Sequence, residues 1–347
     1  MEQVAGVDQV AGVEHVVGQD GYDVVVVGGG SAGLSGALAL GRARRRVLVV
    51  DAGDPRNAPA AGVHNYLTSE GLPPAELVAA GRAEVEAYGV EVRRGTAVAA
   101  APLDVGPGRT AFTVDLADGT RVRARRLLVT TGLTDLLPDV PGVAQRWGRD
   151  VVHCPYCHGY EVRDEPVGVL GTGPMAAHVA LLFRQWSPDV VLFQHTAPAL
   201  TPEEAEQLAA RGIDVVAEPV AGLEVVDDRL SGVRLVSGAV VPRRAVVVSP
   251  RFAARSAVLE GLGVAAEEFR MGEHVLGTSV PADPMGATSV PGVRVAGNVT
   301  APMAQVIAAA AAGLQAGAAL NGELVTEDTA LAVARHREEA GAYAGRS

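Results

Sequence analysis

The sequence contains two cysteines, Cys154 and Cys157, which stand at Cys-x-x-Cys spacing in the run His153-Cys154-Pro155-Tyr156-Cys157-His158-Gly159-Tyr160-Glu161. Thiols at this spacing can close a small disulfide ring and reopen it, or can supply half of a metal site. A complete zinc site needs four ligands, and the sequence has no second Cys-x-x-Cys. The flanking histidines are further candidate ligands, but their adjacency to the cysteines makes tetrahedral ligation awkward. We therefore interpret the pair as a redox-active disulfide, and a metal site or unreactive thiols are the alternatives.

Thiol chemistry at neutral pH needs a base near the incoming thiol, and histidine suits this task. Thiols titrate near ~8.5 and imidazole near ~6.5, so protons pass readily between them near neutrality. His158 is our first candidate, with a purely structural role as the alternative. His153 is a weaker candidate because adjacent strand residues point to opposite faces of a sheet. His64 stands in a predicted loop, where a histidine is usually just solvated.

The composition excludes several classes of function. The formal net charge of -11 argues against binding to nucleic acid or to an anionic membrane. The sequence has no lysine, which removes Schiff-base and P-loop-lysine chemistry. No signal peptide is recognisable, and the longest apolar run, Val306 to Leu314, is too short to span a bilayer. We therefore expect a cytoplasmic protein, and in that compartment a lone Cys-x-x-Cys is more often catalytic than structural.

A glycine-rich turn near the start of the chain has the context of a dinucleotide-binding site. A buried-strand pattern over Tyr22 to Val27 runs into Gly28-Gly29-Gly30-Ser31-Ala32-Gly33, and a helical stretch follows to about Leu40. A second strand, Arg46 to Val50, ends in Asp51. In such a βαβ unit the glycines allow a tight turn, a close approach to a pyrophosphate and close helix packing, and the acid accepts a ribose hydroxyl. The alternative is a glycine-rich turn without a ligand.

A second unit of the same kind follows the cysteines but lacks the residues that select a nucleotide. Pro166 to Leu170 is a predicted strand, followed by Gly171-Thr172-Gly173-Pro174-Met175-Ala176, a helix to about Trp186 and a strand over Val190 to Phe193. The next residues, 194–198, contain neither an acid for a ribose diol nor an arginine pair for a 2′-phosphate. We therefore expect the nucleotide-binding fold here without the nucleotide.

The remaining elements are predicted in outline. Residues 1–20 contain a short imperfect repeat and are interpreted as an extension without assigned function. A helix that opens at Ala301-Pro302 and continues to Leu320 is expected to pack on the first βαβ unit. The other predicted elements are an amphipathic helix over 73–89, strands over 91–99, 109–117, 120–130, 213–216, 221–226, 232–236 and 239–248, a strand over 293–298 that ends in a turn, and a surface helix over 327–339.

Over residues 21–322 the chain resembles the thioredoxin-reductase-like flavoproteins. The resemblance rests on four motifs in the right order: Gly28 to Gly33, Thr131-Gly132, Cys154 to Cys157, and Val295 to Asn298 with Gln305. It implies an α/β protein with two Rossmann-like three-layer domains, in which an FAD domain is interrupted by a smaller NAD(P)-binding-like domain that carries the cysteines. The corresponding segments are 21–135 and 251–347 for the FAD domain, with the C-terminal helix, and 136–250 for the smaller one.

The resemblance also implies roles for individual residues. Cys154 is the thiol that the substrate attacks, and Cys157 is the one beside the flavin. His64 gains weight as a candidate base because its loop is expected to pass near the flavin. The implied FAD-binding residues are Gly28, Gly30, Ser31, Ala32 and Gly33 for the pyrophosphate, Asp51 for the adenosine ribose, Thr131 and Gly132, Asn65 near the isoalloxazine, Asn298 where most of the family has Asp, and Gln305 and Val306 at the pyrimidine edge.

Two departures from the reductase pattern point to one branch of the family. Thioredoxin reductases usually follow the second cysteine with Asp, but here His158 follows it, and the basic NADPH pattern is replaced by His195-Thr196-Ala197-Pro198. Both changes resemble the dithiol oxidases of disulfide-containing natural products, the gliotoxin and holomycin type. Membership of that branch implies a homodimeric enzyme of natural-product biosynthesis. Such an enzyme takes electrons from a small-molecule dithiol without NADPH and passes them through FAD to O2, which gives H2O2.

Three other functions stay open at this point. An NADPH-dependent, thioredoxin reductase-like disulfide reductase is the nearest, with Arg184 and Arg211 as substitutes for the missing basic residues. A redox sensor, whose cysteines switch a partner surface, is a second alternative. A metal-binding module is the third. The sequence does not identify the dithiol.

Overall fold

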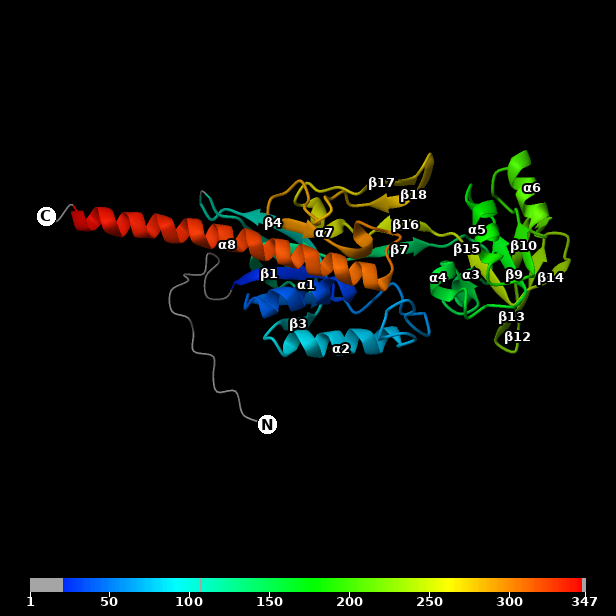
Figure 1. The fold of residues 1–347 in the computed structure, drawn as a ribbon, viewed down its shortest axis with the longest axis horizontal. Helices are drawn as coiled ribbons and strands as arrows, with labels where there is room; N and C mark the ends of the chain where they lie inside the picture. The colour runs from blue at the N-terminus through cyan, green and yellow to red at the C-terminus, as the bar shows by residue number, and fades with distance from the viewer. Residues whose placement is uncertain (1–20, 107, 345–347) are drawn as a thin grey trace, which may run out of the picture.

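The computed structural model of the protein describes residues 21–106 and 108–344, so the extension predicted over residues 1–20 lies outside the described residues. The chain forms a large and a small α/β domain, which lie side by side along the longest axis of the molecule (Figure 1). It enters the small domain after β7 (Leu133–Leu136) and returns before β16 (Arg251–Ala254), and these two strands pair antiparallel. The boundary predicted between residues 135 and 136 therefore falls inside β7.

The large domain is built on a sheet whose central strands are parallel. The strand order is β3-β2-β1-β6-β5-β4, with β19 added beside β6, and β1 pairs in parallel with both β2 and β6. All residues of β1 are buried, as expected for a strand covered on both faces. The strands are β1 (Tyr22–Val27), β2 (Val47–Asp51), β3 (Glu91–Arg94), β4 (Ala97–Leu103), β5 (Ala111–Leu116), β6 (Arg121–Val129) and β19 (Val293–Val295).

Three helices flank this sheet, namely α1 (Ser31–Arg42), α2 (Pro74–Glu86) and α8 (Val306–Ala344). In Figure 1, α1 lies beside α8. Their backbones approach so closely that a Cβ atom at Gly313 would stand 1.9 Å from the carbonyl oxygen of Ala32. A Cβ atom at Gly317 would likewise meet the carbonyl oxygen of Gly36 at 2.6 Å. The expected packing of the alanine-rich helix on the first βαβ unit is confirmed.

The small domain is a second parallel sheet, in the order β11-β10-β9-β15-β8. Its strands are β8 (Val151–Val152), β9 (Val167–Leu170), β10 (Val190–Phe193), β11 (Asp214–Val216) and β15 (Ala245–Val248). Helices α5 (Ala176–Phe183) and α6 (Pro202–Ala210) complete its crossovers. Two such sheets with crossover helices confirm the expected class of two Rossmann-like units.

The other elements form smaller layers. One antiparallel sheet joins β12 (Val220–Val226), β13 (Arg229–Leu235) and β14 (Val240–Pro242). Another joins β17 (Glu267–Met271) and β18 (His274–Ser279) to β16 and β7. The short helices are α3 (Val143–Arg146), α4 (Pro155–His158), α7 (Ala257–Glu260) and the 3-10 helix η1 (Gly297–Val299).

Three predicted elements are corrected. The strand expected over 91–99 is two strands, because β3 pairs in parallel with β2 and β4 pairs antiparallel with β5. The strand expected over 239–248 is also two strands, β14 and β15. β14 ends at Pro242 because proline has no N–H to donate to the sheet, and β15 pairs with β9 in the small-domain sheet. The helix expected from Ala301 begins only at Val306, and it continues without a break through the predicted surface helix.

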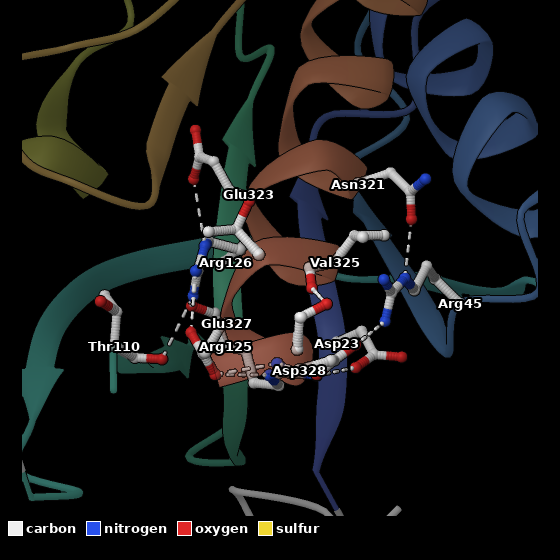
Figure 2. Close-up of polar contacts among 12 residues, drawn as sticks. Asp23, Arg45, Thr110, Arg125, Arg126, Asn321, Glu323, Val325, Glu327 and Asp328 are labelled. Carbon is white, nitrogen blue, oxygen red and sulfur yellow. Dashed lines mark hydrogen bonds and ion pairs between the residues drawn. The ribbon is translucent and has the colours of Figure 1, made fainter. Parts of the chain in front are cut away.

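Buried ion pairs hold α8 against the central strands β1 and β6 of the large-domain sheet (Figure 2). Arg125 of β6 is 1% exposed. Its guanidinium donates to Asp23 at 3.0 Å, to Glu327 at 2.8 Å and to Asp328 at 2.5 Å. The neighbouring Arg126 donates to the second oxygen of Glu327 at 2.8 Å. Buried charges are tolerated only when paired, so this network fixes the position of α8 along β6.

A third arginine completes the attachment from α1. The residue Arg45, just after α1, donates from Nη1 to Asp328 at 2.7 Å and from Nε to the amide oxygen of Asn321 at 2.8 Å. Beyond Asp328 the helix leaves the domain and projects into solvent (Figure 1). Residues 329–341 are exposed there except for the half-buried Leu331.

Replacing Arg125 is expected to loosen this attachment. In Arg125→Ala the buried Asp23 loses its guanidinium partner and Glu327 keeps only Arg126, so the protein should lose about 3–5 kcal/mol of stability. A lower midpoint of urea unfolding measures this loss. The matched control is Arg121→Ala on the same strand, whose exposed pair with Asp115 should leave the midpoint nearly unchanged. Equal midpoints for the two variants would contradict the role of the network.

Candidate active site

The cysteine pair and the glycine-rich turn open onto one cavity of about 1150 Å³. The turn lies there because β1, β2 and β6 are parallel, so that Gly28, Asp51 and Thr130 follow their strands at the same edge of the sheet. The small domain supplies the opposite wall through the residues that follow β8. Of the predicted site residues, the cavity is lined by Gly28, Gly30, Ser31, Ala32, Asp51, His64, Thr131, Gly132, His153, Cys154, Cys157, His158, Asn298, Gln305 and Val306.

The glycine-rich turn has the geometry that its sequence predicts. Gly28 has φ +107°, a conformation that residues with a side chain rarely adopt. A Cβ atom at Gly33 would lie 1.9 Å from the carbonyl oxygen of Gly28, so only glycine lets α1 pack this closely on β1. A Cβ atom at Gly30 would have no atom within 4 Å. Gly30 therefore faces open space in the cavity, at the N-terminus of α1.

Asp51 is held in place by two groups, one of which the sequence did not reveal. Its Oδ1 accepts a hydrogen bond from the backbone N–H of Gly29 at 3.0 Å. Its Oδ2 pairs with the guanidinium of Arg82 from α2. The Nε of Arg82 is buried without a hydrogen-bond partner. Arg82 lies 31 residues from Asp51 in the chain, and no motif marks it.

The two cysteines are free thiols at the start of α4, with Cys154 as its N-cap. A hydrogen bond from Cys157 lowers the pKa of Cys154 to about 7, although burial opposes this shift. The backbone N–H groups of Cys157 and Tyr156 lower the same pKa further. The shared hydrogen bond and burial raise the pKa of Cys157. The reduced pair therefore keeps one proton on Cys157 and places its negative charge on Cys154.

Arg56 is a second residue that the sequence analysis missed. Its positive charge lowers the pKa of both cysteines. Asp135 of β7 holds the guanidinium through two hydrogen bonds of 2.8 and 2.7 Å, and the ring of Phe252 lies 5.3 Å below it. A loop of the large domain thus supplies a fixed cation to thiols of the small domain.

His158 is an imidazole without partners. Both of its ring nitrogens are buried and make no hydrogen bond to any residue that the structure describes. Burial lowers its pKa, which the nearby Glu161 partly offsets. His158 is therefore neutral at pH 7 and can accept a proton inside the cavity.

The other two histidine candidates reach the same cavity by different routes. β8 ends at Val152, so the strand alternation that we used against His153 does not apply to it. Its Nδ1 lies 3.2 Å from the carbonyl oxygen of Val248, and burial lowers its pKa. His64 lies between two carboxylates, with Nδ1 2.7 Å from Glu70 and Nε2 3.5 Å from Glu161 of the cysteine motif.

Two predicted cofactor residues act on the protein itself. Asn65 is not among the residues that line the cavity, and its amide donates instead to the carbonyl oxygen of Tyr156, which ties the loop of His64 to α4. The amide of Asn298 donates to the carbonyl oxygens of residues 301, 302 and 304 at 2.9–3.3 Å. This bonding delays the start of α8, and a carboxylate could not donate it. The predicted cofactor roles of both residues stay predictions.

The residues present fit the FAD that the resemblance implies. The cavity is larger than an ordinary ligand pocket of up to about 1,000 Å³ and runs from the glycine-rich turn to the cysteines. Gly30 leaves room for a phosphate beside the N-terminus of a helix, where backbone N–H groups attract anions. The unpartnered nitrogens of Arg82 and His158 would gain partners from a bound group.

The second glycine-rich turn differs from the first. The backbone N–H groups of Thr196 and Ala197 both bond to the carbonyl oxygen of Gly171 at 3.1 Å, so the chain after β10 folds back onto the turn. The Nδ1 of His195 accepts a hydrogen bond from the N–H of Val220. The guanidinium of Arg184 donates to the carbonyl oxygens of residues 187 and 211. Arg184 is thus engaged with the backbone rather than directed at a nucleotide.

Residues 21–106 and 108–344 contain neither a membrane-spanning helix nor a cluster of metal ligands. No helix among them is long and apolar enough to cross a bilayer. No three His, Cys, Asp or Glu side chains among them come together as ligands for a metal ion.

Comparison with known proteins places the chain among disulfide oxidoreductases. The profile described as pyridine nucleotide-disulphide oxidoreductase matches residues 22–315. Thioredoxin reductase sirT of Leptosphaeria maculans is 30% identical over 324 residues, which cover 89% of this chain and 96% of the relative. Thioredoxin reductase tcpT of Claviceps purpurea is 35% identical over 190 residues, 52% of this chain. The chain spans only 58% of tcpT and 38% of a further curated relative, named a probable thioredoxin reductase.

A solved structure agrees with the fold over nearly the whole chain. The crystal structure of HlmI is 46% identical in sequence, with a TM-score of 0.86. The match covers 93% of this chain and 98% of HlmI.

Gly30→Ala is expected to weaken FAD binding without harming the fold. The added methyl group has room in the protein but points into the space that the pyrophosphate approaches, so FAD affinity should fall by about tenfold or more. Fluorescence titration of the apoprotein with FAD measures this change. Gly33→Ala is the contrasting variant, because its methyl group would collide with the carbonyl oxygen of Gly28 and lower the melting temperature. Unchanged FAD affinity in Gly30→Ala would overturn the assignment.

The acidity of Cys154 is expected to depend on Cys157. Because its pKa is lowered to about 7, alkylation of Cys154 in the reduced protein should rise with pH around a midpoint near that value. Cys157→Ala removes the hydrogen-bond donor and should move the midpoint up toward ~8.5. Cys157→Ser keeps a donor and should stay closer to the wild type. The rate of iodoacetamide labelling, followed by mass spectrometry, gives each midpoint, and identical midpoints in all three proteins would count against this pairing.

Proposed function

The chain belongs to the pyridine nucleotide-disulphide oxidoreductase family, and within that family we propose that it is a dithiol oxidase. The thioredoxin-reductase-like members of the family are FAD-dependent oxidoreductases. The chain converts a small-molecule dithiol, of the kind found in natural products, into a disulfide through Cys154 and Cys157. Oxygen is the final electron acceptor and is reduced to H2O2.

The observation that carries this proposal is the difference between the two glycine-rich turns. The first faces the cavity of the cysteines and has its acid in place at Asp51. At the second, the backbone of Thr196 and Ala197 bonds to Gly171, and the following residues offer neither a carboxylate nor a guanidinium. One dinucleotide site is thus equipped for binding and the other is not. An enzyme with one such site needs electrons from its thiol substrate rather than from NADPH.

The chemistry begins with the enzyme disulfide between Cys154 and Cys157. A substrate thiol gives its proton to a base, and its thiolate attacks Sγ of Cys154, which breaks the enzyme disulfide and releases Cys157 as a thiolate. The second substrate thiol is deprotonated in turn and attacks the substrate sulfur of the mixed disulfide. The product disulfide closes, and Cys154 leaves with the electron pair. Its lowered pKa favours this departure.

The protons and electrons are accounted for by residues of the site. His158, neutral and without partners in the protein, accepts the proton of the incoming thiol. The thiolate of Cys157 takes up the proton of the second substrate thiol and holds it, because the pKa of Cys157 is raised beside the charged Cys154. Held by the turn from Gly28 to Gly33 and by Asp51, FAD would supply an acceptor for the two electrons of the reduced pair, whose loss restores the Cys154–Cys157 disulfide, and would deliver them to O2. His64 and His153 line the same cavity and are the alternative bases.

A thioredoxin reductase-like reductase that uses NADPH is the second candidate. The names of the relatives sirT and tcpT, both thioredoxin reductases, favour it. It requires a nucleotide at the second glycine-rich turn. Homodimer formation and a cytoplasmic location stay predictions from the sequence under either function.

Anaerobic flavin absorbance distinguishes the two candidates. The FAD-loaded protein should be bleached by dithiothreitol alone and regain its colour in air with release of H2O2, while NADPH and NADH leave it yellow. The variant Cys154→Ser should stay yellow with dithiothreitol, because no enzyme disulfide can form. Rapid bleaching by NADPH would overturn the oxidase proposal in favour of the reductase. Protein that does not become yellow with FAD would overturn both.

A further inference from the structure

One face of α5 lines the cavity beside the cysteines. Apart from His178 the helix is apolar, and the face turned away from the cavity is buried in the small-domain core through Ala176, Ala177, Ala180 and Phe183. The other face stays half-buried or exposed and follows helical spacing. We call it the α5 face, and it consists of Met175, His178, Val179 and Leu182.

The small-domain wall of the cavity has no carboxylate and no guanidinium group among its described residues. Among the described residues between 136 and 250 that line the cavity, none is an aspartate, a glutamate or an arginine. The large-domain wall is different, because it carries the ion pairs Arg82–Asp51, Arg56–Asp135 and Arg255–Asp54. The charged wall suits the phosphates and ribose of a dinucleotide. The wall without such groups suits a ligand without charge.

We call the surroundings of the cavity-lining His64 the rim, and two carboxylates lie there. Glu70 and Glu161 flank His64, with side chains that are 62% and 42% exposed. Glu161 belongs to the same run as the cysteines, and the whole chain carries a net charge of -11. An anionic dithiol would therefore be repelled at the rim and would lose its hydration at the wall.

We propose that the α5 face, together with Pro155 and Tyr156, is the substrate-binding wall, and that it selects a compact, electrically neutral, apolar dithiol. This inference rests on the proposed function and adds the class of substrate to it. An α-helix rises 1.5 Å per residue, so the eight residues of α5 span about 12 Å. That length matches a small molecule, whereas a protein substrate needs an interface of about 800 Å² on each side.

Two dithiols that differ by one charge test the inference. Dihydrolipoamide is neutral, and dihydrolipoate carries a carboxylate on the same carbon chain. The wild-type holoenzyme should oxidise dihydrolipoamide with a kcat/KM about tenfold or more above that for dihydrolipoate, measured by oxygen uptake. Binding of the product disulfides, lipoamide and lipoate, gives a second readout through the fluorescence of Trp147, which lines the cavity. Lipoamide should bind about tenfold more tightly.

A charge placed on the α5 face should reverse this preference. In Val179→Arg the guanidinium attracts the carboxylate, so the ratio of the two kcat/KM values should shift toward dihydrolipoate by about tenfold or more. Val179→Met, which is uncharged and of similar length, is the matched control and should keep the wild-type ratio. Yellow colour and an unchanged melting temperature verify that each variant is folded.

The outcomes separate this inference from the proposed function. If the wild type oxidises both dithiols equally, or if Val179→Arg leaves the ratio unchanged, the α5 face does not select the substrate although the oxidase stands. If neither of these dithiols nor dithiothreitol drives oxygen uptake, the proposed function fails. The two disulfides then still test the wall by binding, and equal affinities would overturn the inference as well.

Discussion

The site depends on a stack of three backbones that approach one another without side chains between them. Gly33 lets α1 touch the turn after β1, and Gly313 lets α8 touch α1 at Ala32. This stack brings the start of α8, with Gln305 and Val306, to the same cavity as Gly30. The ion pairs around Arg125 hold the far half of α8 on the sheet. A side chain at either glycine would force the helices apart and separate the two parts of the cofactor-binding surface.

The redox chemistry depends on contributions from both domains. The small domain carries the cysteines and His158, and the large domain supplies the charge of Arg56, which Asp135 holds. The loop of His64 reaches across to the cysteine motif through Glu161 and through the bond from Asn65 to the carbonyl of Tyr156. The pKa of Cys154 is lowered mainly by the hydrogen bond from Cys157 within the small domain, and the charge of Arg56 from the large domain lowers it further. The charged wall of the cavity belongs to the large domain, and the wall without carboxylates and guanidinium groups belongs to the small domain.

The sequence predicts those parts of the site that are written in consecutive residues. The turn from Gly28 to Gly33, the acid Asp51 and the cysteine run all follow from local spacing. Arg56 and Asp135 are 79 residues apart in the chain, and Arg82 pairs with Asp51 from another helix, so no local pattern marks them. The start of α8 was misplaced because the amide of Asn298 competes for the carbonyls of the residues before it. Propensity alone cannot detect such a tertiary override.

The charge of Arg56 acts on thiols that belong to the other domain. The acidity of the two thiols therefore depends in part on how the two domains are arranged. Any rearrangement that carries α4 away from Arg56 also makes the thiols weaker acids and slower nucleophiles at neutral pH. The thiol reactivity of the cysteines is thus coupled to the conformation of the protein. The rate of labelling by a thiol-reactive reagent therefore reports a domain movement that leaves the secondary structure unchanged.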